Sequence, residues 1–262
     1  MHRRLKRAAA NLADRMGYTI IPNWRLGTFQ GSRFLRRLFR YLDIDCVIDV
    51  GANTGQYRDF LRQEVEFGGH IVSFEPVPHH VNALKERARY DEKWAVNGCA
   101  LGARSGRAKF NVMMNTEFSS FLDPVHDSVD LFRGKNDVCE TVAVEVRTLA
   151  DVIPECRTEL GAGNIFLKLD TQGFDLEVLK GASDMLPSLR ALQTEASVRK
   201  IYDGMPRYDE TIRFLEDHGF VMSGIFPNNA GHFPLLVEFD CYLINRTYVP
   251  EGLIPSSKTK VS

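Results

Sequence analysis

The sequence predicts an α/β fold, a mostly parallel sheet that is covered by helices on both faces. Short apolar runs at 46–50, 70–74 and 165–169 are each followed by glycine or an acidic residue. Helical patterns separate these runs, and strands that alternate with helices form parallel sheets. The 262 residues, 44% of them hydrophobic, suffice for a substantial core and a deep pocket.

The first elements follow from local apolar spacing. Residues 3–16 and 31–43 have helical spacing and form a basic helical segment, 1–44, before the first strand. The elements that we expect next are strand 46–50, helix 56–66, strand 70–74, helix 78–89 and strand 94–97.

The middle of the chain interrupts the alternation. Residues 109–114 and 141–146 have β character, so we expect a hairpin-like, β-rich insertion around a loop at 115–140. Loops of this length are often functional, and 118–121, with two phenylalanines, suit a lid over a pocket. The elements expected after it are strand 165–169, helix 176–186, strand 192–194, helix 209–218 and strands 220–225 and 237–244.

The formal charge of −1 is distributed unevenly. Residues 1–44 contain ten Lys or Arg and two acidic residues, so this segment carries +8 and the remainder −9. The segment could simply be a solvated helix face, which is the more common case, or it could bind an anionic membrane surface, cover the pocket or form a contact between two copies of the chain. No stripe of aromatic and basic residues accompanies the charge, which argues against nucleic acid as a partner.

The cysteines and the lengths of the apolar runs indicate in which cellular compartment the protein is expected. The five cysteines are widely spaced and include no CxxC pair, which is typical of reduced thiols. The stretch 8–13 is too short for a signal-peptide core, and no apolar run approaches the length of a membrane span. We therefore expect a cytoplasmic protein that could lie peripherally on the inner face of the membrane, with a disordered tail at 250–262.

A glycine-containing loop follows the first strand and precedes a helix, which is where open parallel sheets bind ligands. Gly51 and Gly55 permit a tight turn and a close backbone approach, and Asp49 places a carboxylate at the strand tip. A dinucleotide fingerprint would need glycine where Asn53 and Gln56 stand, and the Lys-Ser or Lys-Thr of a P-loop is absent. The loop therefore favours a ligand without phosphates.

Glu75 ends the second strand, twenty residues after Gly55. An acidic side chain at this place in such folds accepts hydrogen bonds from the ribose hydroxyls of a bound nucleoside. A strand-tip acid, a glycine turn and a ribose-binding acid together predict an adenosyl ligand, and S-adenosylmethionine fits this description.

Six motifs follow one another along residues 45–245. They are Asp49 to Gly55, Phe74 to Pro76, Cys99 to Gly102, Arg147 to Asp151, Asp170 to Asp175 and Leu179 to Ala182. In this order they resemble the FkbM family of S-adenosylmethionine-dependent methyltransferases. The resemblance implies a class I methyltransferase (Rossmann-like) domain over 45–249 and, commonly, O-methylation of a hydroxyl on a sugar, glycolipid or polyketide.

The resemblance also implies which residues bind S-adenosylmethionine. They are Asp49, Gly51, Ala52, Asn53 and Gly55 for the methionine part, Glu75 with the adjacent Pro76 for the ribose, and Cys99, Ala100 and Leu101 beside the adenine. The stretch 202–206 resembles a family motif that would form the wall of the acceptor side.

Methyl transfer to a hydroxyl requires an oxygen in line with the sulfonium methyl and a base that takes the hydroxyl proton. Asp170, at the tip of the fourth strand, is the predicted base, or alternatively a contact to the cofactor amine. Glu195 ends the next strand and could share the proton with Asp170, but two carboxylates are too few to predict a metal. His232 lies in a polar turn that could reach over the pocket.

Three interpretations stay open at this point. The first is an O-methyltransferase that acts on a small-molecule, glycan or glycolipid acceptor. The second is an N-methyltransferase of the same fold, although the Asn-Pro-Pro-Tyr type of motif is absent. The third is a binding or scaffold protein without catalysis, against which the cofactor-type residues argue.

Overall fold

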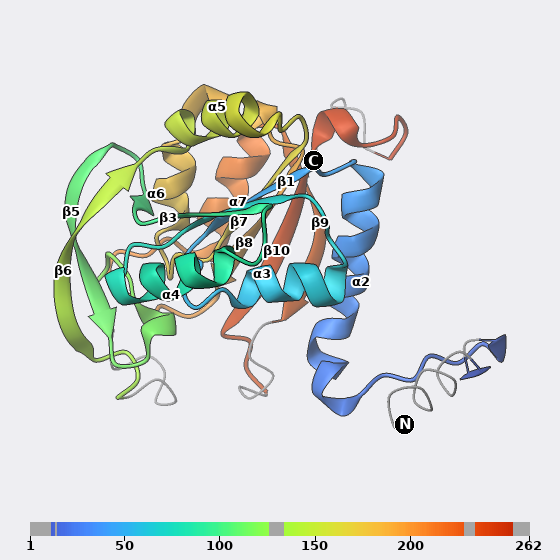
Figure 1. Ribbon diagram of the computed structural model, residues 1–262, viewed down its shortest axis with the longest axis horizontal. Helices are drawn as coiled ribbons and strands as arrows, with labels where there is room; N and C mark the ends of the chain where they lie inside the picture. The colour runs from blue at the N-terminus through green and yellow to red at the C-terminus, as the bar shows by residue number, and fades with distance from the viewer. Residues whose placement is uncertain (1–11, 14, 126–133, 228–233, 254–262) are drawn as a thin grey trace, which may run out of the picture.

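The computed structural model describes residues 12–13, 15–125, 134–227 and 234–253. Its centre is a seven-stranded sheet in the order β3-β2-β1-β7-β8-β10-β9 (Figure 1). The strands are β1 Cys46–Val50, β2 His70–Phe74, β3 Trp94–Asn97, β7 Ile165–Leu169, β8 Ala191–Ser197, β9 Phe220–Pro227 and β10 Glu238–Asn245. β10 is antiparallel to both of its neighbours, and the other pairs are parallel. The predicted mostly parallel sheet is confirmed.

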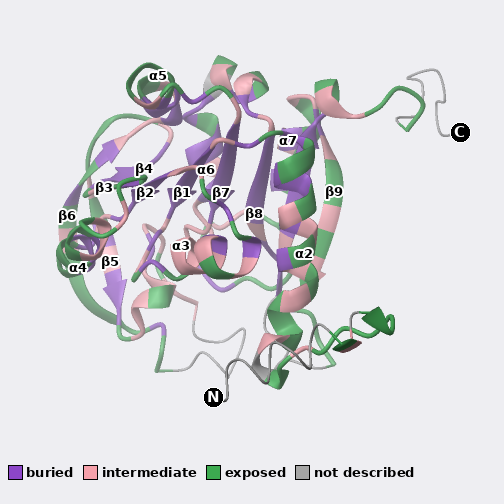
Figure 2. Ribbon diagram, turned by 45° about the vertical axis from the view of Figure 1, so that its right-hand side comes forward, coloured by how far each residue is buried: buried purple, intermediate pink, exposed green. Residues whose placement is uncertain are grey.

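Helices cover both faces of the sheet, as predicted. Those of one face are α2 Leu26–Tyr41, α3 Gln56–Phe60 and α4 Pro78–Ala88, and those of the other are α5 Leu149–Leu160, α6 Asp175–Lys180 and α7 Tyr208–Asp217. Neighbouring strand residues divide between the two cores: Val47 and Phe166 join the α2 side, and Ile48 and Leu167 join the α5 side. Figure 2 shows the resulting layers, with buried strands between helices whose outer surfaces are exposed.

The chain order of the strands determines where a ligand can bind. From β1 the chain proceeds outward through β2 to β3, and it then returns to the other side of β1 as β7. The two halves of the sheet diverge at this point, so a crevice opens beyond the carboxyl ends of β1 and β7.

The predicted β-rich insertion is present between β3 and β7. A separate three-stranded sheet contains β4 Ala100–Leu101, β5 Gly106–Met113 and β6 Val138–Arg147. β5 and β6 are antiparallel, and the loop between them carries a short 3₁₀ turn, Thr116–Phe118. This sheet lies at one side of the molecule in Figure 1.

Three helix predictions were wrong at their boundaries. α2 begins at Leu26 rather than at 31, because the 3₁₀ turn Asn23–Arg25 leads directly into it. The helix predicted over 56–66 changes to a π-helical turn at Leu61–Val65. The helix predicted over 176–186 ends at Lys180, and a 3₁₀ helix, Ser183–Ser188, with Pro187 inside it, follows.

One helix was not predicted at all. α5 begins with a capping box in which Thr148 and Asp151 bond to each other's backbone N–H. The apolar side of α5 packs on the central sheet through Val152 and Ile153.

Some predicted segments lie wholly or mainly outside the described residues. These are helix 3–16, of which 12, 13, 15 and 16 are described, and the tail 250–262, described to 253. None of the described helices is long and apolar enough to cross a membrane. The five cysteines, all described, are free thiols.

Candidate active site

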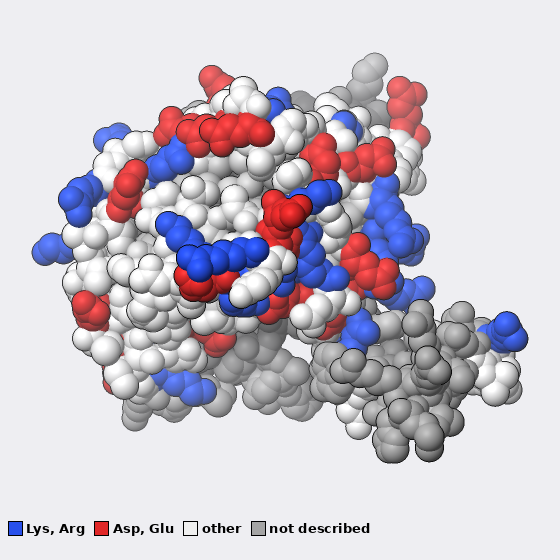
Figure 3. Space-filling view, viewed as in Figure 1, with Lys and Arg blue, Asp and Glu red and all other residues white. Residues whose placement is uncertain are grey.

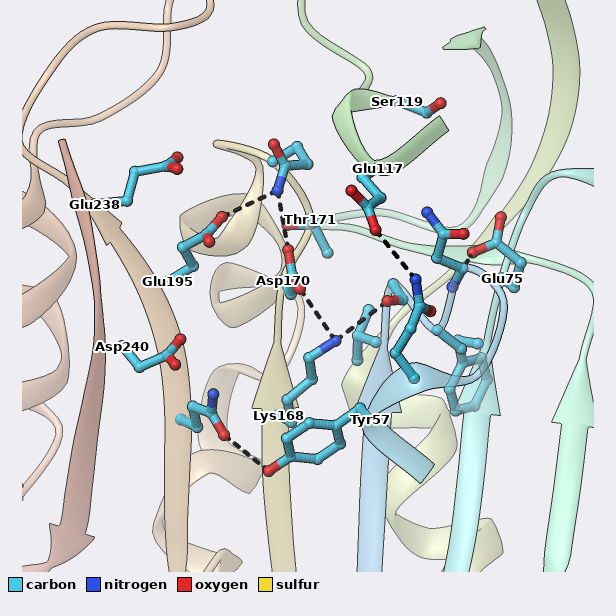
Figure 4. A pocket seen from close by; sticks show the side chains of 18 of the residues that line it. Tyr57, Glu75, Glu117, Ser119, Lys168, Asp170, Thr171, Glu195, Glu238 and Asp240 are labelled. Atoms are coloured by element: carbon cyan, nitrogen blue, oxygen red, sulfur yellow. Dashed lines mark hydrogen bonds and ion pairs between the residues drawn. The ribbon is translucent and has the colours of Figure 1, made fainter. Parts of the chain in front are cut away.

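A cavity of about 540 Å³ lies beyond the carboxyl ends of β1 and β7. Its wall includes the loop after β1, the end of β2, the tip of β7, β8, β10 and the insertion loop. Figure 4 shows carboxylates from several of these elements directed into this one space. The volume lies in the range typical of small-molecule sites.

The loop after β1 forms one wall of this cavity. Gly51 has a φ of +80°, and a Cβ on it would lie 2.0 Å from the carbonyl oxygen of Asp170, so only glycine fits here. The backbone N–H groups of Gly51 and Ala52 donate to the carbonyl of Phe74 at 3.1 Å. These bonds fix the loop against the end of β2.

Glu75 is buried at the end of β2 and contributes to the cavity wall. Its Oε2 accepts a hydrogen bond from the backbone N–H of Asn53 at 2.7 Å, and its Oε1 accepts one from Val77 at 2.9 Å. Each carboxylate oxygen can accept a second hydrogen bond. Backbone hydrogen bonds therefore orient Glu75, and each of its two oxygens can accept one further hydrogen bond from a hydroxyl group.

The other residues expected to bind a cofactor divide into two groups. Gly51, Ala52, Asn53, Pro76, Ala100, Leu101 and Asp170 line the cavity. Asp49, Gly55 and Cys99 do not line it. Asp49 is fully buried inside β1, where Ser73 Oγ donates to its Oδ2 at 2.9 Å.

Lys168 was not predicted, although it lies two residues before Asp170 on the same strand. Its Nζ lies 3.2 Å from Asp49 Oδ1, 3.5 Å from Asp170 Oδ2 and 3.1 Å from the carbonyl oxygen of Gly51. Burial alone lowers the pKa of Lys168, but Asp49 and Asp170 together raise it above its usual value. The ammonium group thus connects β1, the glycine loop and the tip of β7 (Figure 4).

Asp170 and Glu195, the two predicted catalytic carboxylates, lie together in the cavity wall. The side-chain amide of Gln172 donates to Asp170 Oδ1 and to Glu195 Oε2, at 3.0 Å in each case. Gln172 adopts a φ of +54°, which is uncommon for a residue other than glycine. One amide group therefore sets the spacing of the two acids.

Two further acids, Glu238 and Asp240, extend this end of the cavity. Asp240 is the cross-strand partner of Glu195, and Glu238 is that of Ser197. Figure 4 shows Glu195, Glu238 and Asp240 on the same side of the cavity. In the sequence alone, the signal for these two acids is that they are polar residues within a predicted strand that is otherwise apolar.

Burial and neighbouring charge raise the pKa values of carboxyl groups at this end of the cavity. Burial, with added repulsion from Glu238, raises the pKa of Glu195 well above its usual value. Burial also raises the pKa of Asp240 to about 6, although a hydrogen bond from Gln193 opposes the shift. These acids hold their protons to a higher pH than exposed carboxylates do.

Replacing Asp240 with Asn is expected to remove a pH-dependent cost of folding. The pKa of Asp240 is higher in the folded than in the unfolded chain, so its contribution to stability is lost as pH rises through about 6. Relative to wild type, D240N should therefore gain about 1–3 kcal/mol of unfolding free energy between pH 4 and pH 7. Urea denaturation across this pH range measures the effect.

The matched control is Asp217→Asn, at an exposed position at the end of α7. As an exposed substitution, it should change the unfolding free energy by no more than about 0.5 kcal/mol. A difference between D240N and wild type that stays the same from pH 4 to pH 7 would contradict the raised pKa of Asp240.

Residues of the insertion reach the cavity and bond to Gln172, which lies between the two acids. Phe118, Ser119 and Phe121 line the cavity, while Ser120 Oγ donates to the carbonyl oxygen of Gln172 at 2.8 Å. The Tyr202 hydroxyl lies 2.8 Å from the carbonyl oxygen of Phe118 and 2.9 Å from Gln172 Oε1. Tyr202, in the motif predicted to form the acceptor-side wall, thus contacts Gln172, but neither it nor the rest of 202–206 lines the cavity. His232 lies outside the described residues.

Comparison with known proteins identifies the class. The family model of the methyltransferase FkbM domain matches residues 49–222. A curated relative, methyltransferase sdnD from Sordaria araneosa, is 27% identical over 159 residues, which make up 53% of this chain and 60% of that protein. The chain therefore spans less than two thirds of this relative.

Two solved structures of low sequence identity were also found. Methyltransferase FkbM from Methylobacillus flagellatus KT is 17% identical, with a TM-score of 0.47, over 77% of this chain and 44% of that one. An O-methyltransferase from Bacillus cereus in complex with SAH is 13% identical, with a TM-score of 0.44, over 82% of this chain and 80% of that one.

The strand order and the family match together define a class I methyltransferase. Because the family model covers more than half of the chain, the protein belongs to the FkbM methyltransferase family. The cofactor of this class is S-adenosylmethionine.

The residues present fit this cofactor. Gly51 lets the loop pass close to the backbone of Asp170 at the cavity wall, and each oxygen of Glu75 can accept one further hydrogen bond from a hydroxyl group. Asn53 lines the cavity, and its buried Oδ1 has no hydrogen-bond partner in the described structure. An orphaned acceptor of this kind is expected where a ligand supplies the donor.

Proposed function

We propose that the protein is an S-adenosylmethionine-dependent O-methyltransferase whose acceptor is a polyhydroxylated molecule such as a glycan or glycolipid. The observation that supports this most is the pair Asp170 and Glu195, held side by side by Gln172 in the cavity wall. A hydroxyl is barely ionised at neutral pH, and a carboxylate is a suitable group to take its proton.

The cofactor would occupy the β1–β2 side of the cavity. Glu75 would accept hydrogen bonds from the ribose hydroxyls, and Pro76, Ala100 and Leu101 would lie beside the adenine. Gly51, Ala52 and Asn53 would lie along the methionine part. When bound there, S-adenosylmethionine supplies an activated methyl group.

The acceptor would occupy the β8–β10 side. Aromatic surfaces would be provided there by Tyr57, Phe226 and Tyr242. Hydrogen bonds from the hydroxyl groups of the acceptor would be accepted by Glu195, Glu238 and Asp240. The Tyr57 hydroxyl donates to Gln193 Oε1 at 2.7 Å, and burial raises its pKa, so it stays a neutral phenol. The acceptor hydroxyl would transfer its proton to a carboxylate oxygen of the Asp170–Glu195 pair.

The same acids give a second candidate function. Glu195 and Asp240 are cross-strand partners that both carry carboxyl groups, and Glu238 lines the same wall. Once ionised, these acids would also attract a protonated amine. An N-methyltransferase of the same fold is therefore the alternative. Acceptors in matched hydroxyl and amine forms distinguish the two.

One experiment tests the cofactor and acceptor sides separately. Calorimetric titration of S-adenosylhomocysteine into the wild type should give a dissociation constant of about 1–10 μM, and Glu75→Ala should weaken it about 100-fold. Glu195→Gln should leave this binding unchanged. With labelled S-adenosylmethionine and a panel of sugars, glycolipids and amino sugars, E195Q should lower methyl transfer about 10²- to 10⁴-fold.

Each outcome has a distinct meaning. A folded wild type that does not bind S-adenosylhomocysteine would contradict the cofactor placement. Methylation found only on nitrogen would replace the first candidate by the second, and unchanged turnover in E195Q would remove Glu195 from proton transfer.

A further inference from the structure

The segment that precedes the catalytic fold exposes large apolar side chains. Leu12, Met16, Tyr18, Ile20 and Leu26 are between 57% and 68% exposed. Exposed apolar residues that occur singly need no explanation, but five along one short segment indicate an interaction surface.

Arginine side chains accompany these apolar residues. Residues 15–42 contain six arginines and no acidic residue, and Arg15, Arg33, Arg37 and Arg40 among them are exposed. Figure 3 shows Lys and Arg side chains along the side of the molecule where α2 runs, with Asp and Glu side chains between them. We call the exposed residues Leu12, Arg15, Met16, Tyr18, Ile20, Leu26, Arg33, Arg37 and Arg40 the N-terminal surface.

The N-terminal surface adjoins the mouth of the active-site cavity. Leu26 directly precedes Gly27, and Gly27, Thr28 and Gly31 line the cavity. Two further exposed leucines, Leu235 and Leu236, lie just before Glu238, which lines the same cavity. Apolar side chains therefore lie next to the cavity on two separate segments.

This combination matches one partner best. Apolar side chains interspersed with arginines suit the interface of an anionic bilayer, in which apolar groups enter the acyl boundary and guanidinium groups meet phosphates. The +8 charge of residues 1–44, on a chain that otherwise carries −9, directs the attraction to this end of the molecule. We propose that the N-terminal surface docks the protein on an anionic lipid bilayer, with the cavity mouth beside the membrane. This inference rests on the proposed function, because it identifies the acceptor of the proposed methyl transfer as a molecule anchored in the lipid bilayer.

Vesicle sedimentation with the full chain tests the proposal. The probes are vesicles of phosphatidylcholine alone and vesicles in which part of it is replaced by phosphatidylglycerol. The wild type should bind the anionic vesicles at least about tenfold more tightly, and added salt should weaken that binding. Arg33→Gln with Arg37→Gln should reduce it about 30-fold, because each arginine near the surface contributes about 1 kcal/mol.

A second double variant tests the apolar contacts between the N-terminal surface and the bilayer. Ile20→Ser with Leu26→Ser should weaken binding to anionic vesicles about tenfold at unchanged charge. The matched control is Tyr90→Ser with Arg89→Gln, an exposed apolar and basic pair just after α4. It should bind vesicles like the wild type.

Several results would overturn the proposal. These are no vesicle binding, equal binding to neutral and anionic vesicles, or surface variants that bind like the control. Self-association of the wild type that the surface variants abolish would instead assign the surface to a second copy of the chain. Calorimetry with S-adenosylhomocysteine separates the two proposals, because the surface variants should retain cofactor binding even if docking fails.

Discussion

Replacing Lys168 with Met should lower the free energy of unfolding by about 3–5 kcal/mol, which is the usual cost of breaking a buried ion pair by removing one partner. The ammonium group lies 3.2 Å from Asp49, whose side chain is fully buried and does not line the cavity. Without Lys168, Asp49 would keep the hydrogen bond that Ser73 donates to it. Methionine preserves the apolar stem but leaves the Asp49 carboxylate buried without a cation. Urea denaturation at neutral pH measures the loss.

Two further variants define the cause. Lys180→Met removes an exposed lysine that pairs with Glu177, and it should change stability by no more than about 0.5 kcal/mol. Asp49→Asn combined with Lys168→Met should recover part of the loss, because the orphaned charge is gone. If K168M were as stable as the wild type, the buried pair would have no structural role.

Replacing Gly51 with Ala should weaken S-adenosylhomocysteine binding about 100-fold, or about 2.7 kcal/mol. A Cβ at this position would lie 2.0 Å from the carbonyl oxygen of Asp170, and the φ of +80° is unfavourable for alanine. The loop must therefore move, and with it the backbone of Ala52 and Asn53. Calorimetric titration measures the change, and circular dichroism shows whether the fold is retained.

Gly68→Ala is the control for this prediction. A Cβ there would meet no atom within 4 Å, so cofactor binding should equal that of the wild type. Binding by G51A as tight as by the wild type would show that the glycine loop does not hold the cofactor.

The sequence predicts the parts of this site that depend on local order along the chain. Gly51 and Glu75 follow their own strands, and each strand end can be recognised from a short apolar run and the residue after it. Asp170 was predicted to lie on the same edge for the same reason. Glu195 was predicted to end its strand, but β8 continues to Ser197; the structure nevertheless places both acids in the cavity wall.

The parts that depend on strand register could not be predicted. Lys168 meets Asp49 because β7 pairs with β1 so that these two residues are partners. Asp240 meets Glu195 because β10 inserts antiparallel beside β8. Periodicity within one strand contains no information about its partner. Gly181, directly after α6, is similar, since a Cβ there would lie 2.0 Å from the carbonyl oxygen of Gly102, a contact that tertiary structure alone creates.

In the proposed reaction, the contacts of Gln172 would couple acceptor entry to proton transfer. The insertion loop bonds to this residue through Ser120, and Tyr202 lies within hydrogen-bond distance of both Gln172 and Phe118. An acceptor that displaces the loop must therefore also disturb the amide that spaces Asp170 and Glu195. By linkage, an acceptor that strengthens the bonds between Gln172 and the two acids would stabilise the contacts of the loop with Gln172 to the same extent. A single hydrogen-bonded unit would then determine both the size of acceptor that can enter and the moment at which its hydroxyl loses the proton.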